Sequence, residues 1–511
     1  MIARIPGWAA ALAALASGAL FSLPFVHTAG WWASIALLVL LASAVQRVPP
    51  RRAALLGWAF GTGWLAAGTW WLYISMHVYG GLPAPMAVAA VLALSGGLSL
   101  YLALAMAVFA GLRSGRPLAD AALFAACWLL AELARGVLFT GFPWIAAGYA
   151  QIDGPLAALA PWIGVYGIGA VAAGAAALLA APARTPIARA GWSALAVAVV
   201  AAAPLAQREF SRPTQRLAVT LVQTNVAQDE KFAVEHLPEA LAWLGQALHA
   251  AGGDLVIAPE TAVPLLPSQL GEEGWRALVA PFAGGDRAAL IGLPLGSFEE
   301  GYTNSVAGIS AGAAGLPGGF YRYDKHHLVP FGEFIPAGFR WFVAMMNIPL
   351  GDFNRGPLAA PSFEVRGERV APNICYEDLF GEELARRFTD PAAAPSIFAN
   401  VSNIGWFGDT IAVAQHLHIS RMRTLELQRP MLRATNTGAT AFIDHRARVL
   451  AELPPFTRGV LAHEVEGRQG LTPFAAWASR FGLWPLLAAG GAVVAAAAFG
   501  ARRRAGTRTA S

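Results

Sequence analysis

Long apolar runs occupy the first 205 residues of the chain and recur once near its end. Seven come first: Trp8–Phe25, Gly30–Val45, Ala53–Met76, Ala84–Leu112, Leu118–Phe139, Pro155–Ala181 and Ala190–Leu205. The eighth is Phe481–Gly500. A helix needs about 20 mainly apolar residues to cross a bilayer. With 56% hydrophobic and 13% charged residues, the chain is also too apolar for an ordinary soluble protein. The pattern predicts a multi-pass α-helical membrane domain of about eight spans.

Basic residues mark alternate loops between these runs. Arg47, Arg51 and Arg52 follow the second run, Arg113 and Arg116 the fourth, Arg184 and Arg189 the sixth, and Arg502, Arg503 and Arg504 the eighth. Because Lys and Arg are enriched in cytoplasmic loops, we expect these loops inside the cell and the region between the seventh and eighth spans outside it. The first run lacks a clear cleavage site and leads into further spans, so we interpret it as retained. Since many basic residues lie in these short loops, nucleic acid is not expected as a partner.

The region after the seventh run differs in kind. It holds most of the acidic residues, and β-like runs alternate with amphipathic stretches such as Glu239–Ala250 and His416–Glu426. About 250 residues of this pattern predict one α/β domain. We therefore expect a membrane domain with seven spans at 1–210, an outward-facing α/β domain at 211–470, and an eighth span with a basic cytoplasmic tail at 471–511.

Three stretches of this domain place reactive side chains at strand ends or in loops. Cys375 lies in PNICYED, Glu260 in IAPETAVP, and Lys325 and Glu333 in YDKHHLVPFGEFIP. The only other cysteine, Cys127, falls in a predicted span, so no disulfide framework is evident. Each residue alone also fits a structural cysteine, a solvated carboxylate or a snorkelling lysine. The ordered set of Glu, Lys, Glu and Cys favours chemistry.

These residue types suit covalent acyl transfer without a histidine. A carboxylate in a poorly hydrated pocket has a raised pKa and can take the proton of a thiol. A fixed ammonium can stabilise the oxyanion formed by attack on a carbonyl, and a second carboxylate can hold that ammonium. The thiol would then carry the acyl group as a covalent intermediate.

These motifs, with NVSNIGWFGD, resemble those of the carbon–nitrogen hydrolase (nitrilase) superfamily. The apolar amino-terminal half, including LFTGFPW and GYAQIDGP, is similar to that of its bacterial apolipoprotein N-acyltransferase branch, so the resemblance covers nearly the whole chain. It implies an αββα sandwich for the α/β domain. It also implies roles for six residues: Glu260 as general base, Lys325 at the oxyanion, Cys375 as nucleophile, Glu333 and Glu377 in support, and Tyr376 in the pocket.

The function implied by the resemblance is N-acylation of the amino-terminal S-diacylglyceryl-cysteine of apolipoproteins, the last step of lipoprotein maturation. A phospholipid would donate the acyl chain in ping-pong order, so the partners would be phospholipid, diacylglyceryl-lipoprotein and the bilayer. The resemblance places the enzyme in the bacterial inner membrane, with its catalytic domain on the periplasmic face.

Two other functions stay open at this point. One is a membrane-tethered amidase or nitrilase that uses water as acceptor, which the Glu-Lys-Cys set does not distinguish, although eight spans favour a lipid substrate. The other is a non-catalytic scaffold, which has no need of all three residues. We expect no cofactor and no metal, because His326-His327 and His416-x-His418 lack an accompanying HExxH or CxxC pattern.

Aromatic stretches are candidates for a lipid gate. Trp341 and Phe342 lie in an apolar segment, Ala337–Met346, which is either a short core helix or, in our hypothesis, a mobile amphipathic arm at the membrane interface. The other candidates are Trp406 and Phe407 on a glycine-flanked loop, and Gly141 in FTGFPW at a membrane boundary. Three positions depart from the family pattern: Phe232 stands where Trp is usual, Ile404 where Asp is usual, and Gly405 where Ala is usual.

Overall fold

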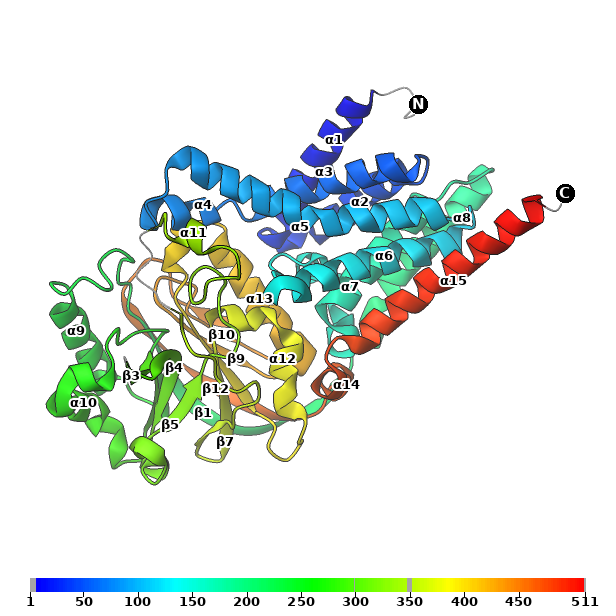
Figure 1. The fold of residues 1–511 in the computed structure, drawn as a ribbon. Coiled ribbons are helices and arrows are strands. Elements are labelled where there is room, and N and C mark those ends of the chain that lie inside the picture. The colour runs from blue at the N-terminus through cyan, green and yellow to red at the C-terminus, as the bar shows by residue number, and fades with distance from the viewer. Residues whose placement is uncertain (1–5, 298, 347–351, 510–511) are drawn as a thin grey trace. The chain divides into compact units, whose positions relative to one another are not determined.

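The computed structural model describes residues 6–297, 299–346 and 352–509, which form two compact units (Figure 1). The helical unit comprises Met1–Trp70, Ala84–Arg208 and Phe481–Ser511. The α/β unit comprises Trp71–Pro83 and Glu209–Arg480.

Eight long helices make up the described part of the helical unit. They are α1 (Gly7–Phe21), α2 (Trp31–Val45), α3 (Pro50–Gly68), α5 (Ala84–Leu112), α6 (Pro117–Val137), α7 (Ala160–Leu179), α8 (Pro186–Ala202) and α15 (Trp484–Thr509). Among the described residues, seven helical segments are long and apolar enough to cross a membrane, and α3 is not one of them. The prediction of a multi-pass helical domain is confirmed, and the predicted number of spans holds approximately.

The third predicted span, Ala53–Met76, is wrong at its carboxyl end. Helix α3 ends at Gly68, and the chain continues through the short helix α4 (Leu72–Ile74) and a π-helical turn at Ser75–Tyr79. The indole Nε1 of the buried Trp71 donates to Oε1 of Gln415 at 3.1 Å, within the α/β unit. The chain from Trp71 to Pro83 therefore belongs to the α/β unit, which its apolar composition did not indicate.

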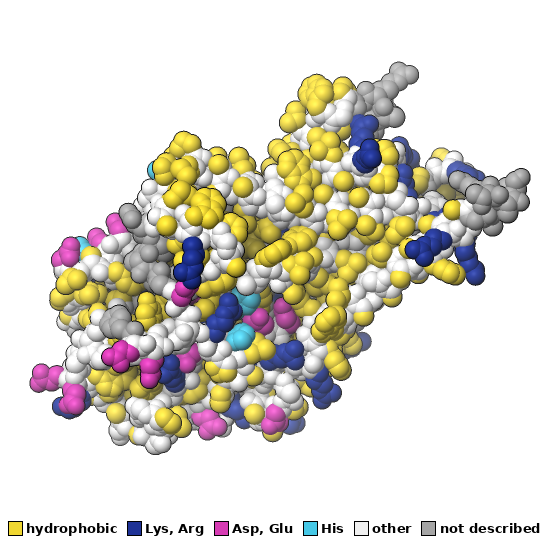
Figure 2. All heavy atoms as spheres, viewed as in Figure 1, with side chains coloured by type: hydrophobic (Ala, Val, Ile, Leu, Met, Phe, Trp, Pro, Cys, Tyr) yellow, Lys and Arg dark blue, Asp and Glu magenta, His cyan; other side chains and the backbone are white. Residues whose placement is uncertain are grey.

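Small and aromatic residues pack the helical unit. A Cβ added to Gly18 or Gly63 would overlap a backbone carbonyl of a neighbouring helix, which allows the close helix contact common in membranes. Aromatic rings fill the space beside these contacts; those of Trp64 and Trp128 stack with centroids 5.6 Å apart. In Figure 2, α5, α6 and α15 are covered mainly by hydrophobic side chains, while acidic side chains are found over the α/β unit.

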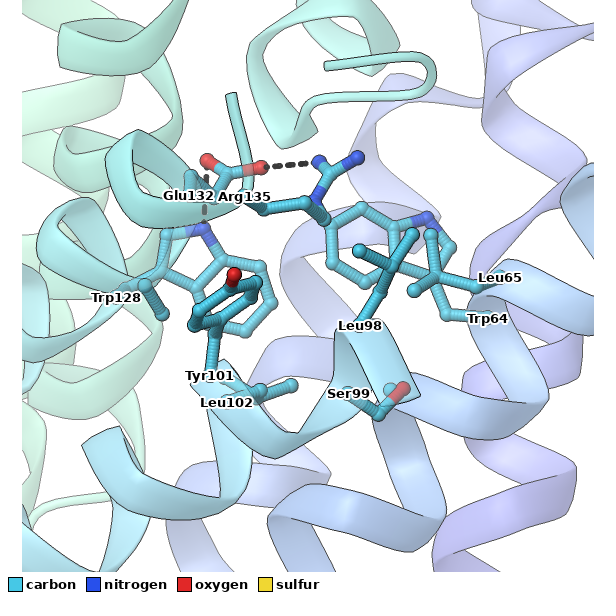
Figure 3. Close-up of a pocket in the computed structure, with 11 residues that line it drawn as sticks. Trp64, Leu65, Leu98, Ser99, Tyr101, Leu102, Trp128, Glu132 and Arg135 are labelled. Carbon is cyan, nitrogen blue, oxygen red and sulfur yellow. Dashed lines mark hydrogen bonds and ion pairs between the residues drawn. The ribbon is translucent and has the colours of Figure 1, made fainter. Parts of the chain in front are cut away.

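Glu132 and Arg135, one turn apart on α6, form the ion pair that their spacing predicts (Figure 3). Oε1 of Glu132 lies 3.5 Å from Nη2 of Arg135 and accepts from the backbone N–H of Ala147 at 2.7 Å. Nη1 of Arg135 donates to the carbonyls of Phe142 and Trp144 at 2.7 and 2.8 Å. Both charges therefore hold the loop after α6 against the helix, which is a structural role.

Two six-stranded sheets form the α/β unit. The first has the order β12-β1-β2-β3-β4-β5, with β12 (Gly459–Gly470), β1 (Ser211–Gln223), β2 (Leu255–Ile257), β3 (Ala288–Ser297), β4 (Gly301–Ile309) and β5 (Tyr321–Asp324). The second has the order β11-β10-β9-β8-β7-β6, with β11 (Val449–Glu452), β10 (Ala441–Ile443), β9 (Met431–Thr435), β8 (Ile397–Ser402), β7 (Glu368–Ile374) and β6 (Phe363–Val365).

The two sheets stack face to face with helices outside them. Val219 and Leu221 of β1 share one apolar core with Val370 and Ile374 of β7. Because strand side chains alternate, Val222 instead faces the opposite side of the first sheet and shares a core with α9 (Leu237–Ala250) and α10 (Pro267–Ala283). The second sheet packs likewise against α12 (Gly381–Ala385) and α13 (Ala412–Leu427). The predicted αββα sandwich is confirmed.

Candidate active site

Cys375 occupies a sharp turn immediately after β7. Its φ of +50° lies in the left-handed region, which residues other than glycine rarely adopt. Its carbonyl accepts hydrogen bonds from Nδ2 of Asn400 at 3.3 Å and from Nε2 of His416 at 3.2 Å. The surrounding side chains therefore hold the backbone in a conformation that projects the half-buried thiol from the end of the sheet.

Glu260, Lys325 and Glu333 form a buried cluster, although Glu260 comes from the loop after β2 and the other two from the loop after β5. Nζ of Lys325 lies 2.8 Å from Oε1 of Glu333 and 3.3 Å from Oε1 of Glu260. Nδ2 of Asn304 donates to the same two oxygens, at 2.7 Å each. Lys325 is fully buried, and Glu260 and Glu333 are each 6% exposed, so the solvated and snorkelling alternatives are wrong for these residues.

The charges of this cluster act on one another and on the thiol. Burial by itself lowers the pKa of Lys325, but the carboxylates of Glu260 and Glu333 outweigh it and raise that pKa above its ordinary value. Burial, and then the charge of Glu260, raise the pKa of Cys375 to about 12, against the opposing effect of Lys325. The resting thiol is therefore protonated at neutral pH, and a base must remove its proton before it can attack.

Glu377 connects the turn of Cys375 to the loop of Lys325. Its Oε2 accepts from the backbone N–H of Ile374 and from the hydroxyl of Tyr323, both at 2.7 Å. Its Oε1 accepts from the backbone N–H groups of His326 and His327, at 2.7 and 3.2 Å. The neighbouring Tyr376 is buried against the rings of His327 and Phe380. Glu377 thus faces four donors of the scaffold and sets the distance between two candidate catalytic residues.

Replacing Glu377 should affect stability and activity together. In Glu377→Ala the four donors lose their acceptor, and one unsatisfied buried group costs about 1–3 kcal/mol, so we expect the free energy of unfolding to fall by at least about 2 kcal/mol. Glu377→Gln keeps one acceptor oxygen and should lie between wild type and alanine. Thermal unfolding and Cys375 acylation, measured on the same samples, check this. Full activity in a stable alanine variant would contradict it.

The five candidate gate residues lie in different parts of the protein. Trp341 is 65% exposed and Phe342 is half-buried on the short helix α11 (Arg340–Val343), so the segment is not a core helix. The ring of Phe407 lies 4.2 Å from that of Trp71, and Trp406 lies 5.9 Å from Tyr79, between ring centroids. The fifth candidate, Gly141, lies in the helical unit; it has φ +79°, and a Cβ there would overlap the carbonyl of Gly136.

Several residues at the site were not anticipated from the sequence. Asn304 bridges the two carboxylates, and the backbone N–H of Asn403 donates to Oε2 of Glu260 at 2.8 Å. Lys231, which is buried, donates from Nζ to the backbone carbonyl of Glu260 at 3.0 Å. An available signal was that Lys231 directly precedes Phe232, a position noted only as a departure from the family pattern.

Comparison with known proteins identifies the family. The carbon-nitrogen hydrolase model matches residues 218–472, and the model for the apolipoprotein N-acyltransferase N-terminal domain matches residues 17–178. A Verminephrobacter eiseniae protein named apolipoprotein N-acyltransferase is 52% identical over 499 residues, covering 93% of this chain and 92% of that protein. The chain belongs to the apolipoprotein N-acyltransferase family.

Other members of the apolipoprotein N-acyltransferase family match over the same extent. A Ralstonia nicotianae protein of that name is 48% identical, covering 98% of this chain and 94% of its own length. One from Pseudomonas putida is 38% identical, covering 94% and 95%. The resemblance predicted from the motifs is confirmed, and a water-using amidase is not favoured as an alternative.

Proposed function

We propose that this protein transfers an acyl chain from a membrane phospholipid to the amino-terminal amine of an S-diacylglyceryl-cysteine lipoprotein. The observation that carries the proposal is the buried cluster of Glu260 and Lys325, whose charges act on Cys375, in a chain that a relative of this name matches over 93% of its length. The apolar helices in the same chain, which are long enough to cross a membrane, support a lipid substrate.

In the first half-reaction, Glu260 takes the proton of the Cys375 thiol. The sulfur attacks the ester carbonyl of the phospholipid, a C–S bond forms, and the ammonium of Lys325 stabilises the oxyanion. Glu333 holds that ammonium in place. When the intermediate collapses, the ester C–O bond breaks and Glu260 returns the proton to the leaving alkoxide. The products are a lysophospholipid and a thioester on Cys375.

The second half-reaction uses the same groups with an amine as nucleophile. The amine of the lipoprotein attacks the thioester carbonyl and gives a proton to Glu260. The C–S bond breaks, an amide forms, and the proton returns to the sulfur. Because the lysophospholipid leaves as the first product before the lipoprotein amine reacts, the kinetics are ping-pong.

An alkyne-tagged phospholipid tests the reaction class with the purified full-length protein. We expect a hydroxylamine-sensitive label on Cys375 that moves to a diacylglyceryl-peptide amine when the peptide is added. Label released only as free fatty acid would indicate a hydrolase. Protein that never acquires label would indicate a scaffold.

We place the α/β unit on the periplasmic face of the bacterial inner membrane, on the basis of the arginine-rich loops. A reporter active only outside the cytoplasm should be active when fused after Arg212 and inactive when fused after Arg504. The paired fusions are measured at matched expression. The reverse pattern would overturn this topology.

The segment Ala337–Met346 is proposed as an arm that steers lipid to Cys375, with Trp406, Phe407 and Gly141 as further gate residues. Its exposed Trp341 and Met345 suit contact with a lipid interface. Replacing Trp341, Phe342 and Met345 together with serine should slow lipid acylation of a folded enzyme while a small water-soluble thiol reagent labels Cys375 at the normal rate. Unchanged lipid acylation in the folded variant would rule the gate out.

A further inference from the structure

A short loop follows β1, and the turn after that loop carries two buried hydrogen-bond donors. Gln228 is 5% exposed and Lys231 is 4% exposed. They lie three residues apart on a helical turn, in which the backbone N–H of Lys231 donates to the carbonyl of Ala227 at 2.9 Å. Side chains at this spacing are neighbours on one side of a turn.

Both donors have hydrogen-bonding capacity that the described part of the protein leaves unfilled. An ammonium has three N–H groups, and within the described residues Nζ of Lys231 makes one hydrogen bond, to the carbonyl of Glu260. Nε2 of Gln228 has no partner among those residues, although its Oε1 accepts from Nδ2 of Asn403 at 2.9 Å. Buried donors without acceptors are costly, so this arrangement suits a ligand that brings acceptor oxygens.

The two donors border the proposed active site. Lys231 binds the backbone of Glu260, and Asn403, the partner of Gln228, binds the side chain of Glu260. A negative charge on Cys375 would raise the pKa of Lys231, which links this ammonium to the thiol. A group bound at Gln228 and Lys231 would therefore lie beside the reacting carbonyl.

Lysine, the residue at position 231, is rare in this chain. Of its 36 Lys and Arg residues only two are lysine, Lys231 and Lys325, and both are buried at this site. Lys325 is held by the carboxylates of Glu260 and Glu333. Among the described residues no carboxylate bonds Lys231, whose hydrogen bond is to a neutral carbonyl. Its charge is therefore available to an incoming anion.

We propose that Gln228 and Lys231 bind the phosphodiester oxygens of the acyl donor while its ester carbonyl lies against Cys375. The proposal rests on the proposed function, in which the donor is a phospholipid. An ammonium and an amide N–H together match an anionic oxygen. The lipoprotein acceptor brings an amine to the reaction, which is itself a donor, and so does not match this pair. The subsite selects phospholipids over acyl esters that have no phosphate.

Because Lys231 titrates, the preference for a phosphodiester substrate should depend on pH. Burial lowers the pKa of Lys231 to about 8, while the charges of Glu260 and Cys375 act in the opposite direction. The charged form is present below that pH and is lost above it, so the advantage of a phosphodiester substrate should decline as the pH rises through 8. Arginine stays charged throughout this range.

The test compares two acyl donors on the full-length enzyme: a phospholipid, and a p-nitrophenyl ester of the same fatty acid. The readout is the rate of Cys375 acylation by intact-protein mass, expressed as the ratio between the two donors. In Lys231→Met this ratio should fall by roughly tenfold or more, and in Gln228→Leu by about threefold, because a charge-assisted hydrogen bond is the stronger of the two. Lys231→Arg should retain most of the preference and lose its decline above pH 8.

One variant serves as the control for this comparison of donors, and several results would overturn the proposal. Glu272→Gln, at an exposed ion pair with Arg276, should leave the ratio unchanged. An equal loss with both donors would mean that Lys231 acts on Glu260 or the thiol, and an unchanged ratio in Lys231→Met and Gln228→Leu would also overturn the proposal. If Lys231→Met does not fold, Gln228→Leu and the pH profile of Lys231→Arg decide. Wild type that accepts the nitrophenyl ester but not the phospholipid would instead refute the proposed function.

Discussion

Cys375→Ala and Cys375→Ser should both abolish the acyl-enzyme, with acyl transfer falling by roughly a thousandfold or more. Serine is the informative replacement, because a hydroxyl is far harder to ionise than a thiol. The pKa of the Cys375 thiol is already raised to about 12 by burial and Glu260, and the same surroundings would oppose ionisation of the hydroxyl further. Intact-protein mass after incubation with phospholipid measures the acyl adduct directly.

The matched control is Cys127→Ala. Cys127 is buried in α6, within the helical unit, and is the only other cysteine in the sequence. We expect this variant to retain activity and the acyl adduct. A hydroxylamine-sensitive label that persists on Cys375→Ser would remove Cys375 from the mechanism.

Glu260→Gln should slow acylation by about 10²–10⁴-fold, the range typical of a lost general base. The same substitution should have the opposite effect on simple alkylation of the thiol. The negative charge of Glu260 is the second cause, after burial, that raises the pKa of Cys375. Without that charge the pKa falls toward its ordinary value, and more thiolate is present at a given pH. The pH profile of iodoacetamide alkylation should therefore shift to lower pH.

A slower acylation together with an unshifted or upward-shifted alkylation profile would contradict this account of Glu260. Glu272→Gln makes the same chemical change at a side chain that is 94% exposed, and should alter neither measurement. Lys325 also loses a carboxylate partner in Glu260→Gln but keeps Glu333 at 2.8 Å, so the cluster should remain assembled.

Strand β9 was not predicted from the sequence, because the charged Arg433 occupies its centre. This side chain is fully buried, and its guanidinium lies 3.4 Å from Asp378. A charge compensated by a residue 55 positions away leaves no local signal. The apolar residues of Phe363–Val370 partly alternate, which predicts a single strand, but the run is a hairpin of β6 and β7 with Arg366 and Gly367 both at positive φ.

The residues of the candidate site were predictable to the extent that chemistry restricts the residue type. A thiol, an ammonium and carboxylates at strand ends form a set with few other uses, so Cys375, Lys325 and Glu260 stood out. Asn304 and Lys231 did not, since Asn and Lys are common in exposed loops and their burial here depends on contacts 44 and 29 residues distant. Glu377 was expected to support the site, but three of its four donors lie 50 to 54 residues away, between Tyr323 and His327.

The segment Trp71–Pro83 makes the α/β unit discontinuous in sequence. A fragment cut at Glu209 and Arg480 would contain both sheets. It would lack Trp71, whose indole packs on Phe407 and donates a hydrogen bond to Gln415. Excising the catalytic unit for crystallography or screening therefore requires grafting this thirteen-residue insert onto the fragment, with a linker in place of the helices that now present it.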